Sequence, residues 1–283
     1  MTKYLRLKIR AFALHPAVLA WSIGFVLFWA VMWVFVFGGS LLEYRGEPWY
    51  EEAVKSYVSL MFGGLGIISM GSASTGIVGN IVPASAATRF LTRFSRLSPK
   101  RLLLEDTLAS LGALLYVASV IILVTLGLSR LRYGVLAAPQ NLPALIGLLV
   151  LLGLFFYALA RFLGYLVLAA GAPKLMKSVA GMLPLLLSFI PYALIFAGKG
   201  NLAGYVFPPI GIQALIVWSV SGRLPPATNL LNWFVRSYVK GEQTPSIVPW
   251  IALASTAVWI AVLWILTMLL YRRAKALHPA ELS

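Results

Sequence analysis

Side chains able to do chemistry are scarce in this sequence. The chain has no cysteine and only two histidines, His15 and His278, which lie at the ends of long apolar stretches. Thiolate sites are therefore excluded, and we expect no metal site, no serine–histidine pair and no other catalytic residue within the apolar part. A GxxxxGK[ST] phosphate-binding loop is also missing, so the sequence predicts no nucleotide site of its own.

Arg161 is the only ionisable residue well inside a predicted membrane-spanning stretch. An arginine at the centre of such a helix costs about 2.5–3.5 kcal/mol, which the leucine, isoleucine, valine and phenylalanine residues before it offset. Two interpretations are open. Arg161 lines a polar path or meets an anionic lipid headgroup, or its side chain snorkels to the membrane surface. Glu105 and Asp106 are candidate partners, and they pair with Arg161 only if its helix is shifted from the predicted span.

The segment 86–100 carries basic and apolar residues at helical spacing. We expect a short amphipathic helix that ends at Ser98, with Pro99 in the first turn of the next helix. Such a helix either lies on anionic lipid headgroups or docks onto a soluble partner. The basic stripe consists of Arg89, Arg93, Arg96 and Lys100, and the apolar stripe consists of Phe90, Phe94 and Leu97.

Composition identifies the solvent around these residues as mostly lipid. The 283 residues are 60% hydrophobic and only 11% charged, with a mean hydropathy of +0.89, whereas a soluble domain has roughly 25% charged residues. We therefore predict an all-α integral membrane protein that forms a single domain over 1–283. Its six predicted spans are 17–37, 57–83, 103–128, 143–170, 179–197 and 248–271.

Three further segments are predicted to be helices that do not cross the membrane. Residues 1–16 form an N-terminal interfacial helix, and 228–240 form an amphipathic one. The apolar stretch 204–220 holds about 12 helical residues after Pro208 and Pro209, which is about 18 Å and too short for a core of about 30 Å. We expect it to be re-entrant or interfacial, on the extracellular side.

The distribution of positive charge predicts the orientation. Of the 23 lysines and arginines, 14 fall on one side of the six-span map and eight on the other. Because positive residues collect in cytoplasmic segments, we expect both termini to be cytoplasmic and the chain to lie in the cell (plasma) membrane. The net charge of +15 is explained in the same way, and no nucleic-acid partner is expected.

Small residues follow one face of the second predicted span. Gly71, Thr75 and Gly79 recur every four positions, and Gly76 lies beside them. Small residues allow helix backbones to approach closely in a membrane. This helix is therefore expected to pack against protein rather than lipid.

The order of these segments resembles the ABC-2-type permease family, the transmembrane subunits of ABC exporters. The resemblance is carried by Arg89-Phe90-Leu91-Thr92-Arg93-Phe94-Ser95-Arg96-Leu97-Ser98-Pro99-Lys100-Arg101 between spans two and three of six. The N-terminal interfacial helix, the extracellular re-entrant helices between spans five and six, and the basic C-terminal end are also similar to that family. The resemblance extends over nearly the whole chain.

The resemblance implies a divided mechanism. A coupling helix at this place sits on a separate P-loop ATPase, so Arg89, Phe90, Arg93, Phe94, Arg96, Leu97, Ser98 and Pro99 would transmit ATP-driven movement. ATP and Mg²⁺ would be bound by the partner ATPase, and no cofactor by this chain. A second permease subunit, identical or different, would complete the translocation path, and membrane lipids would surround it.

Two other classes of function remain open. A membrane-embedded enzyme acting on lipids would need convergent histidines or carboxylates near its spans, whereas half of the eight acids lie in 38–56. A non-transporting assembly or anchoring protein would also suit the small-residue face of the second span.

Overall fold

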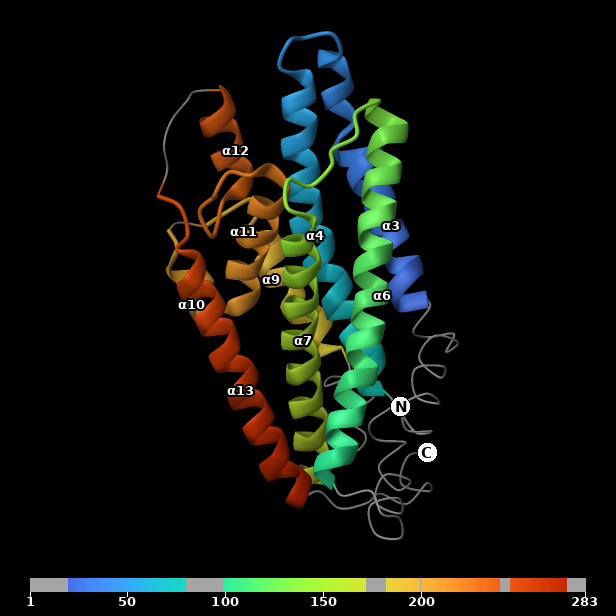
Figure 1. The fold of residues 1–283 in the computed structure, drawn as a ribbon, viewed down its shortest axis with the longest axis vertical. Coiled ribbons are helices and arrows are strands. Elements are labelled where there is room, and N and C mark those ends of the chain that lie inside the picture. The colour runs from blue at the N-terminus through green and yellow to red at the C-terminus, as the bar shows by residue number, and fades with distance from the viewer. Residues whose placement is uncertain (1–19, 80–98, 172–181, 199, 240–244, 274–283) are drawn as a thin grey trace.

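The computed structural model describes residues 20–79, 99–171, 182–198, 200–239 and 245–273. Within these ranges every regular element is helical, and the long helices run side by side along the longest axis (Figure 1). In chain order the elements are η1 Ala20–Gly24, α3 Phe25–Val31, η2 Met32–Phe37, η3 Gly39–Tyr44, α4 Tyr50–Gly79, α6 Pro99–Tyr133, α7 Leu142–Ala170, α9 Leu183–Ala193, α10 Leu202–Val206, α11 Pro208–Ser221, α12 Leu230–Val239 and α13 Pro249–Arg273.

Four helices, α4, α6, α7 and α13, are long and apolar enough to cross a membrane. Their exposed surface is rich in large apolar side chains, for example Leu123 on α6 and Trp250 on α13. A protein in water rarely exposes apolar area on this scale. The prediction of an all-helical membrane protein is confirmed at this level.

Two of the long helices extend beyond their predicted spans. α4 begins at Tyr50, seven residues before the predicted start of the second span at residue 57. Glu51 and Glu52 fall in its first turn, where the helix dipole favours acidic residues, and Lys55 lies 2.7 Å from Glu51. α6 begins at Pro99, where the Ser-Pro pair predicted a helix start, and runs to Tyr133.

The first predicted span is helical throughout its described part, whereas the fifth contains only a short described helix. The segment 20–37 is a continuous run in which two π-helical stretches flank α3. α9 has 11 residues and contains Pro191, and residues 172–181 before it lie outside the described ranges. α9 alone provides about 16 Å of helix, roughly half of a bilayer core, so a fifth crossing also needs the residues beside it in the predicted span 179–197.

The short helix α11 is buried within the bundle. It packs against α4, α7 and α13, and nearly all of its 14 residues are buried. Its length of about 21 Å agrees with the expectation that it does not cross. A Cβ on Gly204 of α10 would lie 3.3 Å from the Gly211 Cα, so these two glycines let α10 and α11 meet closely.

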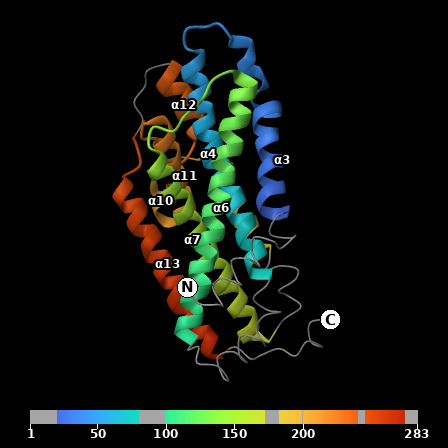
Figure 2. The same cartoon turned by 45° about the vertical axis from the view of Figure 1, so that its right-hand side comes forward.

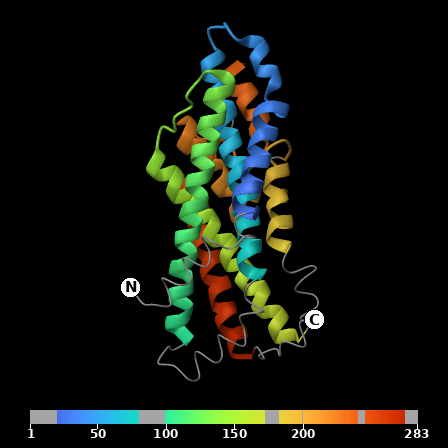
Figure 3. The same cartoon turned by 90° about the vertical axis from the view of Figure 1, so that its right-hand side faces the viewer.

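The helices alternate in direction. The segment 20–37, α6 and α9 run towards the upper end in Figure 1, whereas α4, α7 and α13 run towards the lower end (Figures 1 and 3). The described chain therefore begins with a helical segment that runs upwards and ends with a helix that runs downwards. α6 begins and α7 and α13 end towards the lower end, while α12 lies towards the upper end (Figure 1).

α4 is the central helix among the described elements. It packs against the segment 20–37, α6, α7, α9, α11 and α12, and Figure 2 shows it between α11 and α6. At Gly71 a Cβ would lie 2.7 Å from the Ser188 Cβ and 3.1 Å from the Pro184 carbonyl oxygen, both on α9. Thr75 donates a hydrogen bond to the Gly71 carbonyl.

The small-residue face extends further than the sequence pattern suggested. Gly76 is half-buried, and the surroundings of Gly79 are not described. Gly63, which lies two four-residue steps before Gly71, and Gly66, which is out of that register, also meet other helices: a Cβ on Gly63 would lie 3.2 Å from Gln213, and one on Gly66 would lie 2.8 Å from Leu149. Helices α11 and α7 thus approach α4 at glycines as α9 does.

Replacing Gly71 with alanine is expected to destabilise the protein by about 1–3 kcal/mol, because the added methyl group forces α9 away from α4. The matched control is Gly112→Ala in α6, where a Cβ would meet nothing within 4 Å. That change should be neutral or stabilising by up to about 1 kcal/mol, since alanine favours the helix. Unfolding in mixed detergent–SDS micelles measures both, and equal effects would contradict a close α4–α9 contact.

Candidate functional site

Most of the predicted docking residues are outside the described ranges. Arg89, Phe90, Arg93, Phe94, Arg96, Leu97 and Ser98 fall within 80–98, whose structure is not described. Pro99 starts α6. The site that the structure does describe begins two turns further along this helix.

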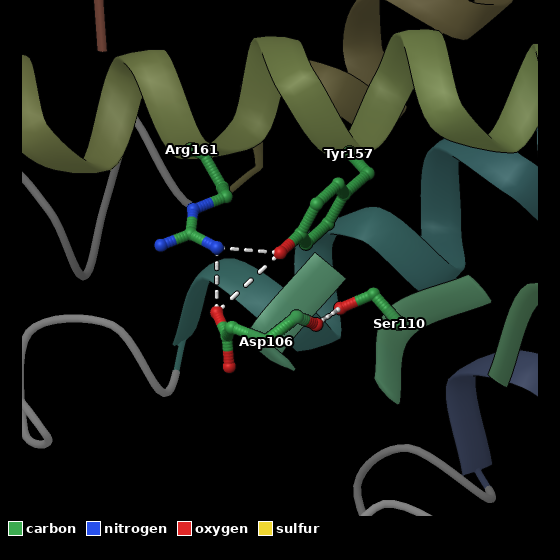
Figure 4. Close-up of polar contacts among 4 residues, drawn as sticks. All are labelled: Asp106, Ser110, Tyr157 and Arg161. Atoms are coloured by element: carbon green, nitrogen blue, oxygen red, sulfur yellow. Dashed lines mark hydrogen bonds and ion pairs between the residues drawn. The ribbon is translucent and has the colours of Figure 1, made fainter. Parts of the chain in front are cut away.

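Arg161 and Asp106 form a buried ion pair between α7 and α6 (Figure 4). The Arg161 Nη1 lies 2.6 Å from the Asp106 Oδ2, and it also donates to the Tyr157 hydroxyl at 2.6 Å. Tyr157 in turn donates to the same Asp106 oxygen at 3.4 Å. The three side chains close a triangle in which each polar group meets the other two.

Burial makes this pair different from the other ion pairs. The Arg161 side chain is only 3% exposed and that of Asp106 is 14% exposed, whereas the partners in the Arg223–Glu52 pair are 52% and 57% exposed. The snorkelling interpretation of Arg161 is therefore wrong, because its guanidinium is enclosed by protein. A charge held in this way has to be neutralised by its neighbours.

Aromatic rings complete the enclosure. The guanidinium carbon lies 5.5 Å from the ring centroid of Tyr157, 5.8 Å from that of Tyr165 and 5.7 Å from that of Trp264. These distances are typical of cation–π contacts. Because Trp264 belongs to α13, Arg161 links three helices: α6 through Asp106, α7 through its own backbone and α13 through Trp264.

Helical spacing places Arg161 and the two tyrosines that contact it on one face of α7. Tyr157, Arg161 and Tyr165 are separated by four residues each, so they project from the same side. On α6 the Asp106 backbone carbonyl accepts a hydrogen bond from Ser110 at 2.8 Å. The neighbouring Glu105 is also buried, and its carboxylate accepts from the Arg101 Nε at 3.1 Å.

The pairing does not require α7 to be shifted along the sequence, so that condition was wrong. α7 covers 142–170, almost as predicted. About 40 Å of α6 separates Asp106 from Tyr133, but only about 28 Å of α7 separates Leu142 from Arg161. The extended connection 134–141 makes up the difference, and α7 begins well below the upper end of α6 (Figure 1).

The connection 134–141 is fixed at its lower end. The Asn141 backbone N–H donates to the Ser219 carbonyl at 2.9 Å, and that of Gln140 donates to Val220 at 3.3 Å. The Asn141 side chain then caps α7 by accepting from the Ala144 N–H at 3.0 Å. These hydrogen bonds to the end of α11 determine where α7 starts along the bundle axis. Arg161 is thereby placed beside Asp106 of α6.

Sequence reasoning found Arg161 and Asp106 but missed Tyr157, Tyr165 and Trp264. The four-residue spacing of the two tyrosines about Arg161 was a signal in the sequence, whereas no pattern indicated Trp264. The arrangement gives a neutral electrostatic link between three helices, close to the end of the bundle where α6 begins. Among the described residues no group of histidine or acidic side chains could hold a metal ion.

Comparison with known proteins adds no assignment to this geometry. No protein-family model, curated protein sequence or solved structure matches the chain at a significant level.

Proposed function

We propose that this chain is the transmembrane permease subunit of an ATP-driven ABC-2-type transporter, most simply an exporter. The observation that carries the proposal is the basic amphipathic segment 86–100, with its Ser98-Pro99 end, between two long membrane helices. ATP and Mg²⁺ bind to separate P-loop ATPase subunits, and a second permease subunit completes the path.

The fold supports this division of labour. α4 ends and α6 begins at the same end of the bundle, so the segment between them is attached at both sides to the central helices (Figures 1 and 3). α10 and α11 lie between α9 and α13 in the chain and near mid-height in Figure 1, away from the end where α6 begins, as re-entrant helices would.

We propose six crossings with both termini in the cytoplasm of the cell. The alternating directions of the segment 20–37, α4, α6, α7, α9 and α13 fit this number. Arg101 and Arg273 lie towards the end that becomes cytoplasmic, and four acids, Glu43, Glu47, Glu51 and Glu52, lie towards the other.

In this proposal the Asp106–Arg161 pair transmits movement from α6 to α7 and α13. Closure of the ATPases would displace the docking segment and the first turns of α6. Because Asp106 lies about 10 Å along α6 from Pro99, its ion pair would carry that displacement to α7 and, through Trp264, to α13. The three helices would then move together rather than slide past one another.

The direct test of the partner is co-isolation in a defined system. The chain is co-expressed with candidate P-loop ATPases from the same genome, solubilised in mild detergent and purified through a tag on the chain. The expected result is a stable complex with equal numbers of permease and ATPase subunits. Recovery of the chain without any ATPase, in detergent and in nanodiscs alike, would contradict the proposal.

A further inference from the structure

A pocket of about 440 Å³ opens between four elements in the half of the bundle opposite Pro99. Its walls come from the segment 20–37, α4, the end of α9 and the start of α12. Its volume falls in the range of about 300–1,000 Å³ found for small-molecule sites. It is lined by Trp33, Phe37, Tyr57, Leu60, Tyr192, Ile195, Phe196 and Leu231.

The lining is aromatic and carries no charge. Five of these eight residues are aromatic, and the other three are leucine or isoleucine. Trp33 is the centre of the wall, with ring centroids 5.6 Å from Tyr57, 6.1 Å from Tyr192 and 6.4 Å from Phe196. The Tyr57 hydroxyl is already used, because it donates to the Trp33 carbonyl at 2.7 Å. The pocket therefore suits a hydrocarbon group rather than a polar one.

The pocket has a closed floor and an open mouth. Leu60 and Ile195 at the floor are 1% and 0% exposed, whereas Phe37 and Phe196 are each 48% exposed and Leu231 is 39% exposed. The mouth is held in place by the backbone, since the Leu231 N–H donates to the Ile195 carbonyl at 3.0 Å. The opening is thus part of the fold and needs no rearrangement to admit a ligand.

The mouth opens onto an apolar surface. The segment 20–37, which forms one wall, also exposes Phe28 and Val36, each 57% exposed. In a membrane this surface faces acyl chains. If the pocket were empty, the side chains that line it would lose van der Waals contacts. Because the bilayer is itself apolar, the preference for this site comes from packing against the rings and not from removal of water.

We propose that this aromatic pocket binds an acyl chain of a membrane phospholipid, inserted from the bilayer past Leu231 to Leu60 and Ile195. The site depends on the membrane location of the chain and not on an ATPase partner. It can therefore be tested, and can fail, independently of the transporter proposal.

Photo-cross-linking in nanodiscs tests the insertion. The full chain is reconstituted in phosphatidylglycerol with a small fraction of phosphatidylcholine that carries a diazirine in its acyl chain, irradiated and analysed by mass spectrometry. Label is expected on the buried Leu60 and Ile195 as well as on the exposed Phe28. Label on Phe28 with none on Leu60, Ile195 or the buried Trp33 would overturn the proposal.

Two matched variants on α12 sharpen the test. Leu231→Trp narrows the mouth and is expected to reduce the label on Leu60 and Ile195 several-fold relative to Phe28. Val235→Trp adds the same group one helical turn away, at a residue that is 41% exposed compared with 39% for Leu231. It should leave unchanged the ratio of label on Leu60 and Ile195 to label on Phe28. Equal ratios in both variants and the parent chain would contradict entry past Leu231. If Leu231→Trp does not yield a monodisperse protein, Phe196→Ala replaces it and should raise the ratio by widening the mouth.

A second copy of the chain is the competing occupant. Because the chain has no cysteine, Leu231→Cys provides a single thiol at the mouth. Rapid disulfide formation between two chains, together with absence of label at Leu60, would assign the pocket to a subunit contact and overturn the lipid site. Label at Leu60 without a disulfide supports it.

Discussion

Replacing Arg161 with methionine is expected to destabilise the protein by about 3–5 kcal/mol, because the change leaves the Asp106 carboxylate buried without its counter-charge. Methionine keeps most of the side-chain length and the contact with Trp264, so the loss reports on charge rather than on volume. The free energy of unfolding in mixed detergent–SDS micelles measures the effect. A loss below about 1 kcal/mol would be typical of an exposed pair and would contradict the buried link.

A double variant separates the ion pair from its two partners. Arg161→Met combined with Asp106→Leu removes both charges, and it should recover a large part of the stability that Arg161→Met alone loses. The control is Glu52→Gln, which breaks the exposed pair with Arg223 at the opposite end. That change should cost less than about 1 kcal/mol.

Reversing the charge of the docking segment is expected to abolish coupling. In Arg93→Glu/Arg96→Glu the basic stripe becomes acidic at its centre, so a surface of the ATPase that binds positive charge would repel it. We expect the variant to insert and fold normally but to lose stimulation of ATP hydrolysis almost completely. ATP turnover by the co-purified complex measures this, and unchanged turnover would contradict docking through this segment.

The control reverses two exposed charges at the other end of the bundle. Lys55→Glu/Arg130→Glu makes the same change in net charge far from the docking segment, and both residues are exposed. This variant should keep full stimulation. Equal loss in the two double variants would show that net charge, and not the docking segment, determines turnover.

Much of the fold could be predicted because local chemistry determines it. Scarce charge identified a membrane protein, and long apolar runs located α6, α7 and α13. Pro99 fixed the start of α6 because proline suits the first helical turn, and the glycines around Gly71 marked α4 as the packed helix. The length of the stretch after Pro208 predicted a helix too short to cross a bilayer core, and α11 has only 14 residues. Each of these inferences depends on residues close together in the chain.

The candidate site could be predicted only in part, because it depends on how far α6 and α7 are displaced from each other along the bundle axis. Arg161 and Asp106 were each recognised, but the connection 134–141 decides whether they meet. That irregular segment is held by hydrogen bonds to Ser219 and Val220 on α11, which no periodic pattern encodes. Trp264 reaches Arg161 through the packing of α13, which is equally non-local. The aromatic pocket around Trp33 was missed for the same reason, since four separate elements form it.

The central claim is that this chain is driven by a partner ATPase, and one measurement tests it most directly. ATP hydrolysis by a P-loop ATPase that co-purifies with the chain is measured in liposomes, with the chain present and absent, at matched ATPase concentration. We predict a higher rate in the presence of the chain and the basal rate with Arg93→Glu/Arg96→Glu. An identical rate with the chain, without it and with the variant would contradict the account.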